Sequence, residues 1–162
     1  MKYNLYDLSQ KQRDLDTYIH KLHNVNYETT KERRLLSFLV ELGECANETR
    51  CFKFWSLKGP SPDDVVFEEY VDGIHFLLSI GNAINYDYHK DIELTGIDES
   101  LVKHFTEVYT LAGNFDFSED KFVELFGSFL GLGVSLGMDW NKLNEVYMKK
   151  WQINVERQQN NY

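Results

Sequence analysis

Cysteine and proline are both scarce in this chain of 162 residues, which has two of each. Cys45 and Cys51 lie six positions apart in a helical pattern, on different faces of one helix, so no disulfide between them is expected. Two reduced cysteines are typical of an intracellular protein. The prolines stand together at Pro60 and Pro62, and the remaining chain has no residue that breaks helices in this way.

Positive charge is also in short supply. Lysine and arginine number 17 against 26 acidic residues, for a net charge of −9 and a pI near 5.0. Such a chain lacks the broad basic surface that binds nucleic acid, so we expect no nucleic-acid partner. An anionic ligand would need a local device, either bound cations or a small basic cluster.

Long apolar runs are missing as well. No stretch approaches the roughly 20 apolar residues that span a bilayer, and Met1–Ser9 lacks the apolar core of a secretory signal. We therefore expect no membrane partner and a cytoplasmic location.

Helical periodicity dominates, and sustained alternation of the strand type is absent. Because 43% of the residues are hydrophobic and 15% aromatic, the chain can bury a core. We predict an all-α fold in a single domain over residues 1–162, a compact bundle of about six helices with a turn-rich stretch at 86–96. The expected helices run over about Leu8–His23, Thr29–Arg50, Pro62–Ala83, Glu99–Ala112, 119–137 and Trp140–Gln158, with capping residues at Thr29, Ser61, Ser118 and Asp139.

Two acid pairs stand out on the second and third helices. Glu41 and Glu44 are three positions apart, and Glu69 and Asp72 repeat that spacing, so each pair projects from one side of its helix. Both helices are apolar on nearly every side, as in a protein core, so the carboxylates should be partly buried.

Buried carboxylates need cations, and nearby lysine and arginine are too few to neutralise four of them. Hard divalent ions with oxygen ligands meet this need, and Mg²⁺ keeps open positions for water and phosphates. We therefore predict that Glu41, Glu44, Glu69 and Asp72 are metal ligands and catalytic residues.

Two other interpretations of the acids remain. Each pair alone is common on a solvated helix face. A di-iron site would use two Glu-x-x-His elements, of which only Asp72 and His75 form a relative. We expect a packed or hydrogen-bonded His75, with His89 and His104 at the surface.

The acid pairs and their neighbours resemble a known family. The runs Glu41–Glu48, Phe52–Ser56 and Glu68–Phe76 are similar to those of the dimeric dUTPases, in the all-α NTP pyrophosphatase superfamily that includes the MazG proteins. The resemblance implies hydrolysis of dUTP, and of dUDP as well, to dUMP, with attack at the β-phosphorus of dUTP. It also implies two or three Mg²⁺ ions and a homodimer.

The resemblance assigns substrate contacts too. Gln12 has a donor and an acceptor to match the imide edge of uracil. Asn47, Lys53, Trp55 and Phe76 are expected around the base and sugar. Tyr147, Lys150, Asn154 and Arg157 match a phosphate motif, in which Lys150 and Arg157, seven apart, share one helix face.

Three alternatives stay open. A MazG-like pyrophosphatase would prefer another nucleotide such as dCTP, and an interaction protein would keep a vestigial acid cluster. Phage members of the family can also bind repressor proteins, so a repressor-type partner is possible if the chain derives from a phage. Residues 86–118, which match the family least clearly, are where such a contact is expected.

Overall fold

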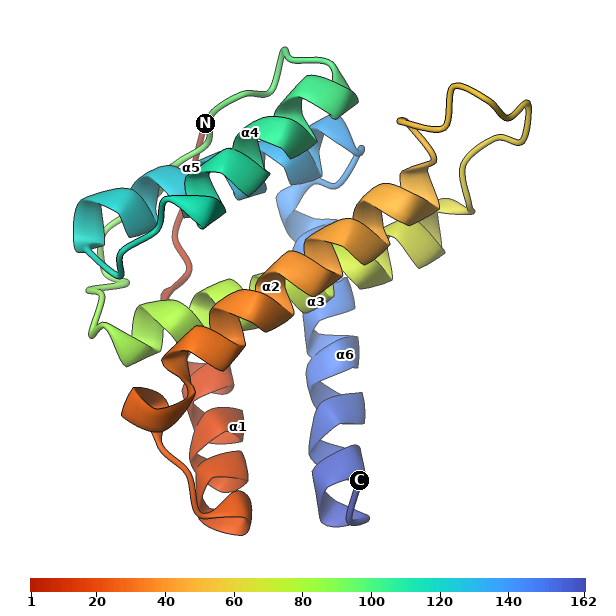
Figure 1. Ribbon diagram of the computed structural model, residues 1–162. Coiled ribbons are helices and arrows are strands. Elements are labelled where there is room, and N and C mark those ends of the chain that lie inside the picture. The colour runs from red at the N-terminus through yellow and green to blue at the C-terminus, as the bar shows by residue number, and fades with distance from the viewer.

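The computed structural model describes residues 1–162 and is built almost entirely from helices, which confirms the all-α prediction (Figure 1). Strands of two residues, β1 (Lys2–Tyr3) and β2 (Ile92–Glu93), pair antiparallel with Tyr3 opposite Ile92. The strand β2 falls in the stretch for which only turns were expected. The six helices are α1 (Tyr6–His23), α2 (Tyr27–Thr49), α3 (Asp63–Ala83), α4 (Leu101–Gly113), α5 (Glu119–Ser135) and α6 (Trp140–Gln159).

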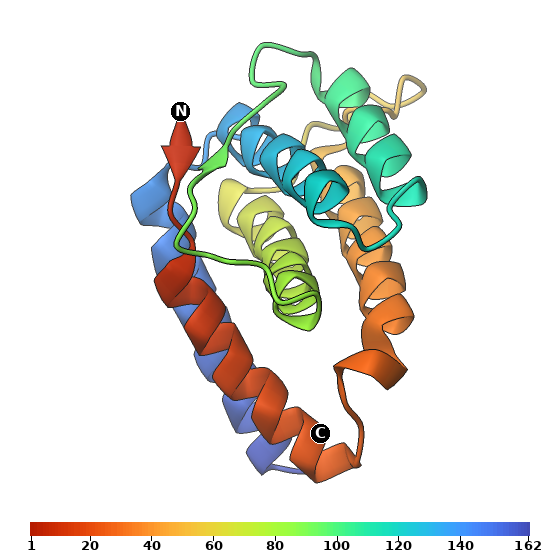
Figure 2. The same ribbon diagram turned by 90° about the vertical axis from the view of Figure 1, so that its left-hand side faces the viewer.

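Helix α3 is the centre of the bundle. It packs against α1, α2, α5 and α6, and Figure 2 shows the other helices arranged around it. Thirteen of its 21 residues are buried, among them Tyr70, Ile74 and Leu78, which are fully inaccessible. The expectation of a core helix is therefore confirmed for α3.

Helix α2 differs from that expectation. Phe38 and Leu42 are fully buried against the core, but Leu36 is 63% exposed and Val40 is 50% exposed. Since α2 packs on α3 and on α4, one of its faces remains outside. The prediction that α2 is enclosed on every side is wrong for the single chain.

The starts of α2 and α3 also differ from prediction. Asn26, not Thr29, is the N-cap of α2: its side chain accepts from the Thr29 N–H at 2.9 Å, and Thr29 Oγ1 accepts from the Asn26 N–H. Ser61 does not cap α3, which begins after Pro62. The Ser61 hydroxyl and N–H instead bind the side chain and carbonyl of Glu48, which attaches the preceding loop to α2.

The later helices follow the sequence signals more closely. Ser118 and Asp139 stand at the N-caps of α5 and α6, and the Asp139 carboxylate accepts from the Lys142 N–H at 2.7 Å. Gly137 follows α5 with a φ of +92°, a conformation that glycine adopts readily. The predicted bounds of these two helices were correct to within two residues.

His104 was expected at the surface, and the structure shows that this is wrong. The side chain is fully buried, and its Nε2 lies 2.8 Å from the Ser128 carbonyl oxygen on α5. The ring also packs on Gly96, where a Cβ atom would lie 2.6 Å from Nε2. A tertiary contact between α4, α5 and the preceding loop thus decides its burial. His89 is exposed as expected.

The glycines of α5 serve close packing within the chain. A Cβ atom on Gly127 would lie 2.5 Å from the Glu93 carbonyl oxygen, and one on Gly131 would overlap the Thr95 carbonyl. The segment around β2 therefore lies directly on the α5 backbone. Packing within one chain therefore accounts for these two glycines.

No single helix is long and apolar enough to cross a membrane. Helices α5 and α6 reach that length and composition only as a pair, with a bend of 104° between them.

The contact between Gly131 and Thr95 can be tested with Gly131→Ala. The added methyl group must displace a backbone carbonyl, so we expect the free energy of unfolding in urea to fall by about 1–3 kcal/mol. Gly113→Ala, at a helical position with nothing within 4 Å, is the matched control and should not destabilise the protein. Equal stability of Gly131→Ala and the wild type would contradict the packing described.

Candidate active site

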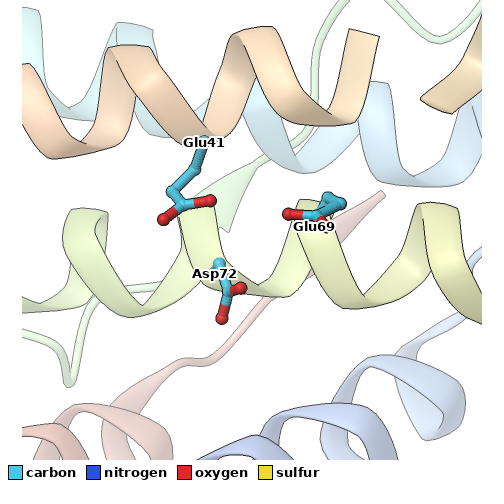
Figure 3. Close-up of side chains that lie close together, drawn as sticks. All are labelled: Glu41, Glu69 and Asp72. Atoms are coloured by element: carbon cyan, nitrogen blue, oxygen red, sulfur yellow. The ribbon is translucent and has the colours of Figure 1, made fainter. Parts of the chain in front are cut away.

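Carboxylates from α2 and α3 converge between the two helices. Single oxygen atoms of Glu41, Glu69 and Asp72 all lie within 4.8 Å of one another, and each side chain is half-buried. Figure 3 shows Glu41 reaching down from α2 toward the two acids on α3. The spacing of three residues places Glu69 and Asp72 on one side of α3. The structure thus brings together three of the four predicted ligands.

Glu44 lies at the edge of this cluster. It is exposed, and its carboxyl group is hydrogen-bonded to that of Glu41. With Asn47, Glu48 and Glu69 it lines a shallow hollow on the outer side of the cluster. The fourth predicted ligand therefore extends the cluster toward solvent.

The carboxylates are poorly compensated. Burial, the hydrogen bond with Glu44 and the neighbouring acids raise the pKa of Glu41 to about 8. Burial also raises the pKa values of Glu69 and Asp72. In addition, Glu41 Oε2 is buried without a hydrogen-bond partner. A buried oxygen that no protein group satisfies fits a position at which a cation could bind.

One lysine offsets part of this charge. Lys150 of α6 is 8% exposed, and its Nζ lies 2.9 Å from Asp72 Oδ2 and 2.8 Å from Glu68 Oε1. The hydrogen bond from Lys150 holds the pKa of Glu68 below its ordinary value. Sequence reasoning missed Glu68, although its position four residues before Asp72 places it on the same side of α3.

A cavity of about 320 Å³ adjoins the acids. It lies between α1, α3 and α6, with two residues from α2; α1 and α6 run side by side, and α3 crosses them (Figures 1 and 2). Its size fits a ligand of nucleotide dimensions. The lining residues are Gln12, Leu15, Asp16, Ile19, Arg34, Glu41, Asp72, His75, Phe76, Ser79, Lys150, Asn154, Arg157, Gln158 and Tyr162.

Five predicted substrate residues line this cavity, and a sixth stands directly behind it. Gln12, Phe76, Lys150, Asn154 and Arg157 line it. Arg157 is exposed at its margin, 5.1 Å from the Tyr162 ring centroid.

Tyr147 is fully buried behind the cavity wall, with its hydroxyl 3.0 Å from Gln12 Oε1. It supports the wall, and in this structure it does not line the cavity.

Three other predicted contacts lie elsewhere. Asn47 faces the outer hollow beside Glu44. Lys53 and Trp55 belong to the loop of residues 51–62, which extends from the far end of α2 and α3 (Figure 1). The Trp55 ring is 63% exposed and touches only its loop neighbours Phe52 and Phe54 among aromatic rings. Within one chain, these residues do not join the cavity.

The inner end of the cavity holds polar residues that sequence reasoning did not assign to it, namely Asp16, Arg34 and Ser79. Arg34 pairs with Asp16 at 3.5 Å and donates to Ser79 Oγ at 2.7 Å. The sequence does contain a pattern that could have placed Asp16 and Ser79 in the cavity. Each lies four residues after a cavity residue, Gln12 or His75, and so shares its helix face. Because these residues come from three helices, only the packing brings them together.

His75 was predicted to be packed or hydrogen-bonded, and this is confirmed. It is buried, stacks on Tyr147 with a centroid distance of 4.1 Å, and contacts Gln12 Oε1 through Nδ1 at 2.7 Å. Burial and the Lys150 charge lower the pKa of His75 to about 3, against a smaller opposite effect of the Tyr147 carbonyl. The ring is therefore neutral at physiological pH.

Fold and site together define a class: an all-α enzyme with a nucleotide-sized cavity, carboxylates on one wall, and lysine and arginine beside them. The family model for dUTPase matches residues 4–162. The chain therefore belongs to the all-α dUTPase family, and its reaction is the hydrolysis of dUTP. None of the curated proteins compared with the chain matches it. Enzymes of this family generally use a divalent metal, for which the carboxylate cluster is a suitable site.

The charge on the cluster predicts a pH dependence of stability. Without metal, folded Glu41 keeps its proton up to a pKa of about 8, whereas the unfolded group loses it near 4.5. The folded state therefore binds more protons between these values, and the free energy of unfolding must fall as the pH rises through them. We expect the urea midpoint in EDTA to decrease from about pH 5 to about pH 8.

Glu41→Gln should reduce this dependence, because it removes the group whose pKa is raised to about 8, while Glu69 and Asp72 remain. Glu107→Gln, which changes an exposed acid on α4, should leave it as in the wild type. A urea midpoint of the wild type that does not fall with pH would show that the cluster is well solvated.

Proposed function

We propose that the chain is a magnesium-dependent enzyme that converts dUTP to dUMP and pyrophosphate, with the ions held by Glu41, Glu44, Glu69 and Asp72. The observation that carries the proposal is the convergence of three carboxylate oxygens from α2 and α3 within 4.8 Å. The cluster stands beside a cavity that also contains Lys150 and Arg157.

The donor set favours Mg²⁺. All four side chains offer carboxylate oxygens, the ligands that hard divalent cations take, and no histidine or cysteine belongs to the cluster. The acids span both the cavity side and the outer hollow through Glu41 and Glu44, so we propose two or three ions. Bound Mg²⁺ would neutralise phosphate charge and lower the pKa of the attacking water.

The protein groups hold the triphosphate. Lys150 stands on the border between Asp72 and the cavity, where its ammonium group meets phosphate oxygens next to the acid cluster. Arg157 and Asn154 lie along the same helix, and the planar guanidinium of Arg157 can bind two oxygens at once. These contacts orient the phosphates for in-line attack at the β-phosphorus. Because the third phosphate is not essential to them, we propose that dUDP is also hydrolysed.

The remainder of the cavity receives the nucleoside. Gln12 supplies polar contacts to the base at the inner end, and Phe76, one turn after Asp72, packs against the deoxyribose where a 2′-hydroxyl would need space. Specificity against other bases follows from polar groups that the wrong base leaves unpaired.

We also propose that the active form is a homodimer. Leu36 and Val40 on the outer face of α2 are at least half exposed, and Phe54, Trp55 and Leu57 on the 51–62 loop are 94%, 63% and 106% exposed. Exposed apolar side chains on a helix face and on a projecting loop mark surfaces for association. Association would cover the exposed face of α2. It would also pack Lys53 and Trp55 against the second copy, where they can contact substrate.

Substrate and metal dependence are tested together. The purified protein is incubated with dUTP, dUDP, dCTP, dTTP and UTP, with Mg²⁺ or with EDTA, and monophosphate and pyrophosphate are measured. We expect Mg²⁺-dependent release of dUMP and pyrophosphate from dUTP, and of dUMP and phosphate from dUDP. Glu69→Gln should lower kcat by at least about 100-fold, because it removes a metal ligand. Glu107→Gln should keep the wild-type rate.

Each alternative has its own outcome. A preference for dCTP would retain the metal site but overturn the role of Gln12. Undiminished hydrolysis in EDTA would overturn the metal proposal. A folded protein without activity on any of these nucleotides would overturn the enzymatic proposal itself.

The dimer is tested by sedimentation velocity. We expect the wild type to sediment as a dimer at micromolar concentration, and Val40→Lys to sediment as a monomer because a charge would be buried in the interface. Thr110→Lys, an exposed change on α4, is the control. A wild type that sediments as a monomer in the presence of Mg²⁺ and dUMP contradicts the proposal.

A further inference from the structure

Asp16 is a buried carboxylate whose hydrogen bonds and charge pairing are all supplied by protein groups. It is 2% exposed and accepts hydrogen bonds from Gln12 Nε2 at 3.0 Å, Tyr27 Oη at 2.9 Å and Ser79 Oγ at 2.7 Å. It also pairs with Arg34 at 3.5 Å. The partners come from α1, α2 and α3, and a carboxylate so surrounded can only accept hydrogen bonds.

This acceptor dictates the orientation of the Gln12 carboxamide. With Nε2 toward Asp16, the Gln12 oxygen faces the Tyr147 hydroxyl at 3.0 Å and His75 Nδ1 at 2.7 Å. The reversed carboxamide would place its oxygen against the Asp16 carboxylate, where neither atom carries a proton. Such an unpaired buried contact is costly, so Asp16 selects one orientation.

The Gln12 orientation in turn selects the tautomer of His75. Because the Gln12 oxygen accepts, His75 Nδ1 must carry the proton and donate. His75 Nε2 is then an unprotonated nitrogen, and it is buried without any hydrogen-bond partner in the protein. The low pKa of His75, caused mainly by burial, agrees with a neutral ring.

We propose that Asp16 is a positioning residue: it fixes the Gln12 carboxamide and, through it, the Nδ1-protonated tautomer of His75, and so sets the hydrogen-bonding polarity at the inner end of the cavity. Asp16 acts through Gln12 and His75, and the acid cluster of α2 and α3 has no part in this chain of contacts.

If the proposed function is correct, this hydrogen-bonding polarity determines which base the cavity prefers. Gln12 retains one N–H that Asp16 does not use, which is a donor. His75 Nε2 is an acceptor that is buried in the wall of the cavity, and both residues line that cavity. A donor beside an acceptor complements the C=O and N3–H groups of uracil. Cytosine has an unprotonated N3, so it meets the His75 lone pair with a second lone pair. The Asp16 network therefore favours a uracil base over cytosine.

The tautomer is measured directly by long-range ¹H–¹⁵N correlation NMR on histidine-labelled protein, which needs no activity. We expect the wild-type His75 signals to show a protonated Nδ1 and an unprotonated Nε2 near neutral pH. A proton on Nε2, donated toward the nearby Tyr147 carbonyl, would overturn the proposal. This measurement decides the matter even if substitutions of Asp16 fail to fold.

Asp16→Asn tests the origin of the polarity. Its amide can donate to the Gln12 oxygen as well as accept, so the reversed carboxamide and the Nε2-protonated form of His75 should appear in the NMR spectrum. The ratio of dUMP to dCMP affinity, measured by calorimetry, should fall at least about tenfold. Tyr27→Phe, which removes a different donor to Asp16, is the matched control and should keep both the tautomer and the affinity ratio.

An Asp16→Asn protein with the wild-type tautomer and affinity ratio would overturn the positioning role. The failure of the proposed function looks different. A wild type with the expected tautomer that does not hydrolyse dUTP leaves Asp16 in its role and removes only the catalytic proposal.

Discussion

The burial of carboxylates on a core helix is the constraint on which the rest of the site depends. Helix α3 is surrounded by α1, α2, α5 and α6, yet it carries Glu69 and Asp72 toward a third acid on α2. Burial raises the pKa values of all three groups, and the one ion pair to the cluster is that of Lys150 with Asp72. Because hydrophobic packing holds these acids close together between the helices, their charge favours bound cations, which is the basis of the proposed metal site.

Asp16 and Glu41 line the same cavity but differ in how their hydrogen-bonding capacity is satisfied. Asp16 receives three hydrogen bonds and an ion pair from its own chain, so it needs no ligand and acts as fixed scaffolding. Glu41 has a buried oxygen without a partner, and its pKa is raised to about 8. The satisfied acid orders the inner end of the cavity, and the unsatisfied one stands where the substrate phosphates and their cations are proposed to bind.

The acid pairs and the helices that carry them were predictable, because spacing along a helix converts directly into a shared face. Neither the burial of His104 nor the roles of Arg34 and Glu68 followed from the sequence, since their partners lie on other helices. Two predicted N-caps were wrong because another residue makes the hydrogen bond. Asn26 accepts from the Thr29 N–H and so caps α2, and the Ser61 hydroxyl donates to Glu48 instead of capping α3. Lys53 and Trp55 are close to the acids in sequence but distant in the chain's fold, because the 51–62 loop leads away from the cavity.

By itself, the sequence determined the all-α class, the approximate bounds of the helices and the shared helix face of each acid pair. These features depend on periodicity and local spacing within single helices. Only the tertiary structure decided which acids meet, that Lys150 stands between Glu68 and Asp72, and that Asp16 holds Gln12. The physical reason is that desolvation and hydrogen-bond satisfaction depend on the neighbours that packing supplies. Those neighbours can be far apart along the chain, as are Gln12 and Tyr147, which are separated by 135 residues.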